Sequence, residues 1–358
     1  MSRMRFTASA ALAFVAALAT AQGSGFRPTG PTKWVVIAGS EAMLEPTEHG
    51  TMGTWQNLRF YPDHLAISEG DTIIFSFRTS DTHNVVFMPK GVKPAVHYIP
   101  SLSDPKRLMV NPLALAAIGG QHFDGSAPVS SGLINAISGM PKEWRVTLAT
   151  PGIWTYVCTP YSTVVPMAGA VGMVGRIEVR KAGSTLPLSP EEVTSAADKA
   201  VAVDIAADEA ADVAARKITS KAGPKGSTVW TMNAGYTTAS SGERMRFGAS
   251  DLTIKVGDIV EWVAKGGYVP HNVYFFSGGD EMPMTIKEGN ILYVNQDVEK
   301  AVGSQVYDGT GVRSSGFIGE GPGRTKTYRL TFTKVGHYEY ICIPHDEMGM
   351  MAYITVTE

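Results

Sequence analysis

The two halves of this 358-residue chain repeat one another, and this duplication is the strongest constraint on its fold. Residues 65–87, LAISEGDTIIFSFRTSDTHNVVF, have a counterpart in residues 252–276, LTIKVGDIVEWVAKGGYVPHNVYFF. TLATPGIWTYVC, which ends at Cys158, aligns without a gap with TFTKVGHYEYIC, which ends at Cys342. A repeat of this length predicts two copies of one structural unit.

Composition favours a globular, mostly β protein. The chain is 44% hydrophobic and 18% charged, with 38 Gly and 21 Pro, a balance that suits many short strands and turns. A chain of this length can form two domains with substantial cores. The formal net charge is −2, and no basic patch for nucleic acid is evident.

The segment between the repeats predicts a helix. Ser189 is a suitable N-cap, Pro190 fits the first helical position, and Glu192 lies where a capping-box acid belongs. The alanine-rich body continues to about Arg216, and we expect glycine and proline at 223–226 to end the helical segment. We predict a domain over residues 27–180, a helical linker over 181–226 and a second domain over 227–358.

The most informative motif is the stretch YEYICIPHDEMGMM, residues 338–351. Cys342, His345 and Met350 follow one another with the spacing C-x2-H-x4-M, after an alternating run typical of a β-strand. Thiolate and thioether sulfur favour copper, and two histidines, one cysteine and a distant methionine form the blue-copper ligand set. The second histidine would be His271, and its neighbour Asn272 could join the two ligand loops through hydrogen bonds.

This pattern resembles the cupredoxin superfamily, in its plastocyanin-like and pseudoazurin-like branch. The resemblance implies two Greek-key β-sandwiches and makes His271, Cys342, His345 and Met350 the ligands of one type 1 copper. Met350 fits the family pattern better than Met348. The resemblance also implies that His345 is partly exposed, as the route for electrons and the contact for a redox partner.

The first half departs from the pattern. Its equivalents are His83, Cys158 and Met173, but Tyr161 stands where the second half has His345, and no histidine lies between Cys158 and Met173. The candidates for the missing ligand are Met167, Tyr161, His97 and His122. A set dominated by sulfur would favour Cu(I). The alternative is a domain that keeps the fold and binds no metal, with Cys158 as a buried thiol.

Features of catalytic copper proteins are missing from the sequence. Multicopper oxidases use paired H-x-H motifs, and none occurs. Copper nitrite reductases place a histidine directly before the cysteine ligand, where this chain has Val157 and Ile341. We also expect no disulfide, because Cys158 and Cys342 occupy equivalent positions in separate repeats.

The N-terminus resembles an export signal. Arg3 and Arg5 precede an apolar stretch and then Ala19-Thr20-Ala21, so residues 1–21 are expected to be a cleaved signal peptide, with no membrane association afterwards. We therefore expect a periplasmic or extracellular protein that carries single electrons between redox partners and is not an enzyme. The alternatives are a protein that stores or delivers Cu(I), and an interaction module with degenerate metal sites.

Overall fold

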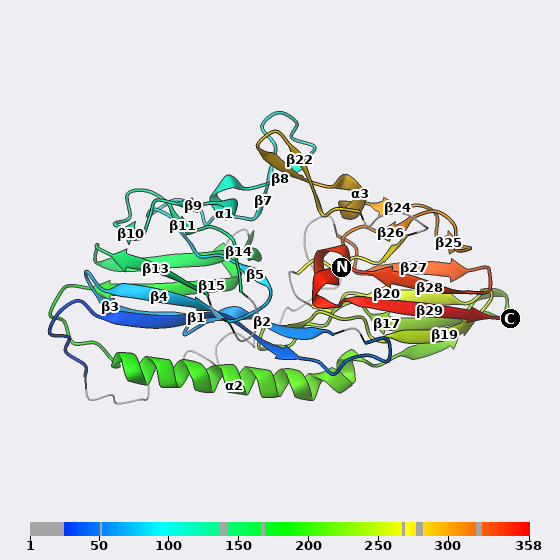
Figure 1. The fold of residues 1–358 in the computed structure, drawn as a ribbon, viewed down its shortest axis with the longest axis horizontal. Coiled ribbons are helices and arrows are strands. Elements are labelled where there is room, and N and C mark those ends of the chain that lie inside the picture. The colour runs from blue at the N-terminus through cyan, green and yellow to red at the C-terminus, as the bar shows by residue number, and fades with distance from the viewer. Residues whose placement is uncertain are drawn as a thin grey trace, which may run out of the picture.

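A computed structural model describes residues 25–50, 52–136, 140, 142–165, 169–266, 269–276, 282–319 and 324–358. Residues 1–21, the expected signal peptide, and Met167 lie outside the described residues. Each half of the chain forms two stacked β-sheets, and the two sandwiches lie end to end (Figure 1). The prediction of a mostly β chain with two sandwiches is confirmed.

The first sandwich combines a sheet of order β10-β13-β4-β1-β2-β18 with one of order β3-β15-β14-β6-β11-β9. The elements of the first half are β1 (Lys33–Met43), β2 (Thr54–Tyr61), β3 (His64–Ser68), β4 (Thr72–Phe77), β5 (Thr82–His83), β6 (Val86–Phe87), β7 (Tyr98–Pro100), β8 (Leu108–Val110), α1 (Pro112–Leu115), β9 (Ala117–Ile118), β10 (His122–Phe123), β11 (Val129–Ser131), β12 (Ile134–Asn135), β13 (Lys142–Leu148), β14 (Gly152–Val165) and β15 (Gly169–Arg180).

The second sandwich combines the orders β16-β17-β20-β27-β25 and β19-β29-β28-β21-β26-β24. The elements after β15 are α2 (Pro190–Ala215), β16 (Thr219–Ala222), η1 (Pro224–Gly226), β17 (Thr228–Asn233), β18 (Gly242–Arg244), β19 (Asp251–Lys255), β20 (Ile259–Val263), β21 (Tyr274–Phe275), β22 (Thr285–Glu288), β23 (Ile291–Val294), α3 (Gln296–Glu299), β24 (Ala301–Val302), β25 (Val306–Tyr307), β26 (Arg313–Ser315), β27 (Thr327–Phe332), β28 (Gly336–Ile341), η2 (Ile343–Met348) and β29 (Met351–Thr357).

The duplicated sequence produces the same aromatic contact in both cores. Phe87 stacks on Tyr156 with ring centroids 5.1 Å apart, and Phe275 stacks on Tyr340 at 4.9 Å. All four rings are buried. Aromatic pairs of this kind contribute beyond the apolar area that they bury. Each pair holds the strand that leads to a cysteine, Cys158 or Cys342, against the strand that follows a histidine.

Helix α2 begins as the sequence predicts. Ser189 accepts a hydrogen bond from the backbone of Glu192, and the Glu192 carboxylate accepts one from the backbone of Ser189, which completes a capping box. The helix ends at Ala215, and strand β16 follows. This end agrees with the predicted end of the helical body at about Arg216, whereas the glycine and proline of residues 223–226 do not end the helix, because strand β16 already separates them from it.

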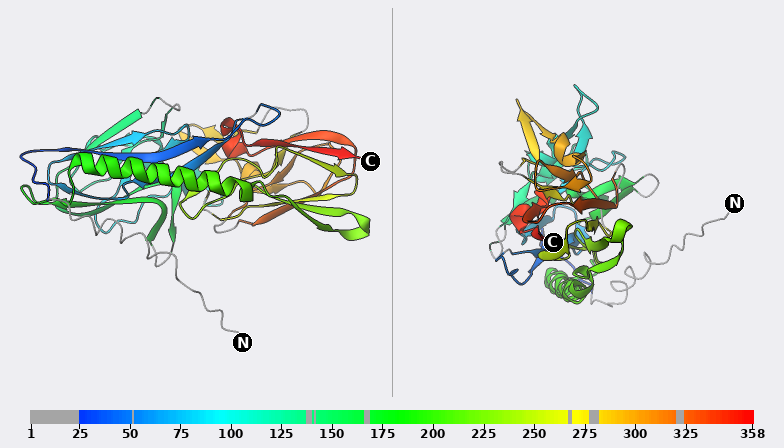
Figure 2. Two further views of the ribbon diagram at one scale, coloured as in Figure 1. Left: turned by 90° about the horizontal axis from the view of Figure 1, so that it is seen from below. Right: turned by 90° about the vertical axis from the view of Figure 1, so that its right-hand side faces the viewer.

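The helix lies along the first sandwich and ends where the second begins, as Figures 1 and 2 show. Its 26 residues span about 39 Å at 1.5 Å per residue. Two acids of the helix accept hydrogen bonds: buried Asp204 accepts from the Tyr61 hydroxyl at 2.8 Å, and half-buried Asp212 accepts from Arg244 at 2.8 Å. Tyr61 and Arg244 both belong to the sheet of the first sandwich, whereas Asn233 of the second sandwich donates a hydrogen bond to the backbone oxygen of Ala215 at 2.8 Å, so the helix contacts both sandwiches. No helix in the described ranges is long and apolar enough to cross a membrane.

Two strand pairings also cross between the halves. Strand β18, from the second half, extends the first-half sheet by pairing with β2. The hairpins β7–β8 and β22–β23 form one four-stranded sheet, in which Met109 pairs antiparallel with Tyr293. Both residues precede Val-Asn in the repeat, so the pairing joins equivalent positions. The halves therefore form one continuous structure.

Candidate metal centre

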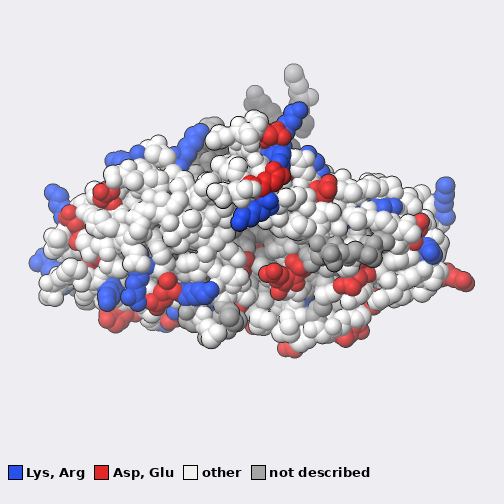
Figure 3. All heavy atoms as spheres, turned by 45° about the horizontal axis from the view of Figure 1, so that its top comes forward, with Lys and Arg blue, Asp and Glu red and all other residues white. Residues whose placement is uncertain are grey.

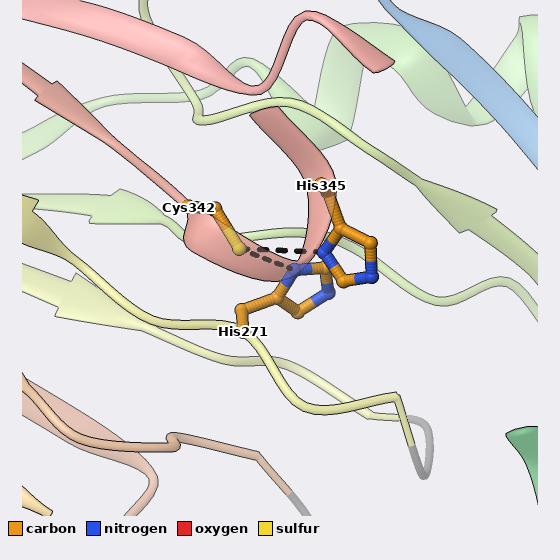
Figure 4. A group of neighbouring side chains, drawn as sticks. All are labelled: His271, Cys342 and His345. Carbon is orange, nitrogen blue, oxygen red and sulfur yellow. Dashed lines mark hydrogen bonds between the residues drawn. The ribbon is translucent and has the colours of Figure 1, made fainter. Parts of the chain in front are cut away.

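Three predicted ligands of the second half converge on one buried point (Figure 4). The Sγ atom of Cys342 lies 3.3 Å from Nδ1 of His345 and 3.8 Å from Nδ1 of His271. Cys342 directly follows β28, and His345 lies in the turn η2. His271 is fixed by two backbone hydrogen bonds with Ile318, at 3.1 and 2.8 Å.

Asn272 joins the two ligand loops, as its position in the sequence suggested. Its backbone N–H donates to Sγ of Cys342 at 3.4 Å, and its side-chain oxygen accepts from the backbone N–H of Ile343 at 2.8 Å. A thiolate accepts such a hydrogen bond more strongly than a neutral thiol does. The contact with Asn272 therefore favours the thiolate, which is the form that binds a metal. Burial has the opposite and larger effect, because it raises the pKa of Cys342.

The two methionines of the loop have different surroundings. Met350 is fully buried in the core cluster that contains Cys342, and its backbone oxygen accepts from the Cys342 N–H at 2.9 Å. Met348 is only half-buried and packs at the boundary between the two halves. This difference favours Met350 as the more distant sulfur ligand, which remains a prediction.

Sequence reasoning missed Glu243 as a partner of the centre. The Nε2 atom of His271 lies 2.9 Å from Oε1 of Glu243, which is itself buried and accepts a hydrogen bond from Thr237. If Nε2 carries the proton, Nδ1 presents its lone pair towards Cys342. Partners of this kind fix the tautomer and orientation of ligand histidines. No local pattern marks Glu243, because its strand β18 pairs with the first-half sheet.

The imidazoles are held in the form that a metal requires. Burial lowers the pKa of His271 to about 3, with the positive charge of Arg324 as a smaller cause. Burial likewise lowers the pKa of His345 well below its ordinary value, with His271 adding to the effect. Both rings are therefore neutral at pH 7, and a neutral imidazole is the metal-binding form. Burial also raises the pKa of Glu243 to about 8.

The first half repeats part of this arrangement. The Sγ atom of Cys158 lies 3.5 Å from Nδ1 of His83 and accepts from the backbone N–H of Asn84 at 3.4 Å. Met173 is buried in the same core cluster as Cys158. Among the residues that the structure describes, His83 and Cys158 belong to no group of three candidate metal ligands. Met167, one candidate for the missing ligand, falls outside those residues.

Tyr161 occupies the position of the missing histidine. Its ring lies beside that of His83, with centroids 5.1 Å apart, and its hydroxyl donates to the carboxylate of Asp81. Of the other candidates, His97 hydrogen-bonds Thr159 at 3.2 Å, and His122 is exposed on strand β10 at a sheet edge. Neither is grouped with Cys158 in the described part of the chain.

The expected exposure of His345 is wrong. Its side chain is only 4% exposed, because the first half packs over this end of the second sandwich. The clearest sign of this packing is at Gly349, where an added Cβ atom would lie 1.4 Å from the backbone oxygen of Met52. His345 instead lines a cavity of about 970 Å³ between the two halves.

A second possible ligand group lies at the surface. Glu48, His49 and Asp251 place their ligand atoms within 4.8 Å of one another, and His49 is 3.5 Å from Asp251. Two of these side chains are exposed and one is half-buried. The group lacks sulfur, so its chemistry differs from that of the buried centre.

Comparison with known proteins matches both repeats. The family described as "Copper binding proteins, plastocyanin/azurin family" matches residues 48–180 and 233–357, which is more than half of the chain. Amicyanin from Paracoccus versutus is 29% identical over 30% of this chain and 55% of its own length. Plastocyanin from Scenedesmus fuscus is 30% identical over 31% of this chain and 85% of its own length.

A solved structure of an amicyanin variant in its Cu(I) form has a TM-score of 0.21 at 21% identity, over 36% of this chain and 80% of that one. This chain spans a little over half the length of the Paracoccus amicyanin and of the plastocyanin from Silene latifolia. The family match covers both repeats, and the buried thiol and imidazoles supply the donors that copper favours. The chain therefore belongs to the plastocyanin/azurin family of copper-binding proteins.

Proposed function

We propose that this protein is an exported electron carrier with one type 1 copper, held in the second half by His271, Cys342 and His345, with Met350 as the distant ligand. The observation that carries this proposal is the convergence of one thiol and two neutral imidazoles at a single buried point. Copper in such a set supplies a reversible one-electron change.

The protein's contribution is rigidity. His271 is held by two backbone hydrogen bonds and by Glu243, and the ligand loop is closed by hydrogen bonds from Cys342 to Met350 and from Met350 to His345. A scaffold of this kind limits rearrangement of the ligands when the charge of the ion changes. Asn272 further stabilises negative charge on the sulfur.

The first half has a structural role in this proposal. Tyr161 stands at the position of a ligand histidine and donates a hydrogen bond to Asp81, so no second imidazole joins His83 and Cys158 among the described residues of this half. A second candidate function, Cu(I) storage or delivery, is favoured by one observation: Cys158, His83 and Met173 still form a buried thiol, imidazole and thioether set.

Export and the partner are further parts of the proposal. The basic and apolar N-terminal residues support secretion to a periplasmic or extracellular space. A carrier in such a space exchanges electrons with a redox partner and turns over no substrate, so we do not class the protein as an enzyme.

The test is copper loading of two matched variants. Cys342→Ala should abolish the intense visible absorption of the copper-loaded protein, whereas Cys158→Ala should leave it unchanged. Copper content per chain should fall from one to zero in the first variant only. Equal loss of colour in both variants would overturn the assignment, and a colourless protein that binds only Cu(I) would favour the storage function.

A further inference from the structure

The cavity beside His345 is a feature that the proposed copper site does not explain. It has a volume of about 970 Å³ and is lined by both halves of the chain. Small-molecule sites usually measure roughly 300–1,000 Å³ and often lie between domains. The cavity is therefore large enough for an organic molecule of one or two rings.

The cavity leads to the candidate copper centre. Of the four predicted ligands in the second half, His345 alone lines it. Its inner wall includes Tyr161 and Met348, which pack against the same boundary cluster formed by Leu58, Met245 and Val269. A molecule in the cavity would thus contact the edge of the His345 ring from one side and the first half from the other.

The charges that line the cavity disfavour an anion. Its described lining contains the acids Asp346 and Glu347, one arginine, Arg324, and Asp81, whose pKa burial raises to about 7. His97 adds no positive charge at pH 7, because burial lowers its pKa to about 4. On the face drawn in Figure 3, acidic and basic side chains are interspersed, so no large patch of one sign draws a charged molecule towards that face.

The remaining lining combines flat, polarizable surfaces with hydroxyl groups. Tyr98 and Tyr161 contribute aromatic rings, and Met284 contributes a thioether, which packs well against aromatic rings. Thr82 and Thr163 offer hydroxyls that donate or accept hydrogen bonds. This chemistry matches a neutral ring that carries its own hydroxyl group.

We propose that the cavity binds a small, neutral hydroxyaromatic molecule of the phenol or quinol class against the edge of His345. The inference rests on the proposed function and deepens it, because such a molecule would be the reductant of the site: it would lose one electron to the copper held there and its hydroxyl proton to solvent. A protein partner would not reach the His345 ring directly, because this residue is only 4% exposed.

The test measures binding to the copper-free protein, using 2-naphthol as the probe. Calorimetry should show saturable binding, and nuclear magnetic resonance should show shifts of the His345 and His97 ring signals. The signals of His64 and His337, which do not line the cavity, should stay in place. A 6-sulfonated 2-naphthol, with the same rings and a permanent negative charge, should bind about tenfold more weakly.

Two protein variants locate the binding site. Thr163→Trp places a large ring in the cavity and should abolish binding, whereas Ser220→Trp, on the exposed strand β16, should bind like the unmodified protein. If Thr163→Trp fails to fold, the pattern of ring shifts in the unmodified protein decides the question. Absence of saturable binding, equal affinity for the sulfonated probe, or shifts confined to His64 or His337 would overturn the proposal.

These outcomes are separate from those of the copper experiment. Blue copper without naphthol binding would leave the carrier function standing and remove the inference. Naphthol binding without blue copper would keep the cavity as a ligand site and remove its redox role.

Discussion

The Nε2 atom of His271 lies 2.9 Å from Oε1 of Glu243, and the strand that carries Glu243 is hydrogen-bonded to the first half of the chain. Glu243 pairs with Gln56 of strand β2, so one ligand candidate of the second half is oriented through a sheet of the first. The candidate copper centre and the boundary between the halves are therefore one structural unit.

Above pH 8, where Glu243 is mostly ionised, Glu243→Gln should weaken copper binding by about 10- to 100-fold, because a neutral amide polarises the His271 ring less than a carboxylate does. Competition with a chelator measures the affinity. The matched control is Glu41→Gln, since Glu41 also hydrogen-bonds Gln56 but has no contact with His271. Equal losses in the two variants would contradict the role of Glu243.

Tyr161→His should create a second copper site. The new imidazole would stand at the position that His345 occupies in the second half, close to His83 and Cys158. Copper content after loading should rise from one to two per chain. Tyr161→Phe removes the hydroxyl and adds no ligand, so its copper content should stay at one per chain. A single copper in both variants would show that the longer first-half loop prevents ligation.

Gly349→Ala should destabilise the ligand loop. Gly349 has a φ of 82°, and an added Cβ would collide with the backbone oxygen of Met52. Gly257 has a φ of 93° but nothing within 4 Å of an added Cβ, so Gly257→Ala reports the conformational cost alone, about 1 kcal/mol. We expect Gly349→Ala to lower the free energy of unfolding by about 2–4 kcal/mol. Denaturant unfolding of the two variants gives the difference, and equal losses would contradict this close packing.

The stability of the protein should fall in mild acid, partly through His97. Its pKa is about 4 in the folded chain because of burial, against about 6.5 when unfolded, so the unfolded state binds more protons between these values. Each pH unit lost in this window lowers stability by at most about 1.4 kcal/mol for this residue. Above pH 6.5, His97 should cause no change of stability with pH, because it is neutral in both the folded and the unfolded chain.

His97→Gln isolates that effect. From pH 6.5 to pH 4.5, the unmodified protein should lose more free energy of unfolding than the variant does. His64→Gln is the control, since His64 is exposed, and it should follow the unmodified protein. If the free energy of unfolding falls equally with pH in His97→Gln and in the unmodified protein, His97 is not buried in its neutral form.

Much of this architecture follows from the sequence because it depends on local patterns. The C-x2-H-x4-M spacing brings Cys342 and His345 together within one turn, and the capping box at Ser189 begins the helix where it was predicted. The repeat predicted the second sandwich, and the structure shows that both halves place an asparagine N–H, of Asn84 or Asn272, against a cysteine sulfur. The domain limits and the ligand assignments stay predictions.

Only the tertiary structure decided how the halves meet. Strand β18 has three residues, too few for a periodic signal, and its pairing with β2 joins segments that are far apart in the sequence. That pairing brings Glu243 to His271, and His345 is buried although the family resemblance implied partial exposure. Residue spacing along one chain segment fixes which donors share a loop, whereas burial and long-range strand pairing depend on the packing of the whole molecule.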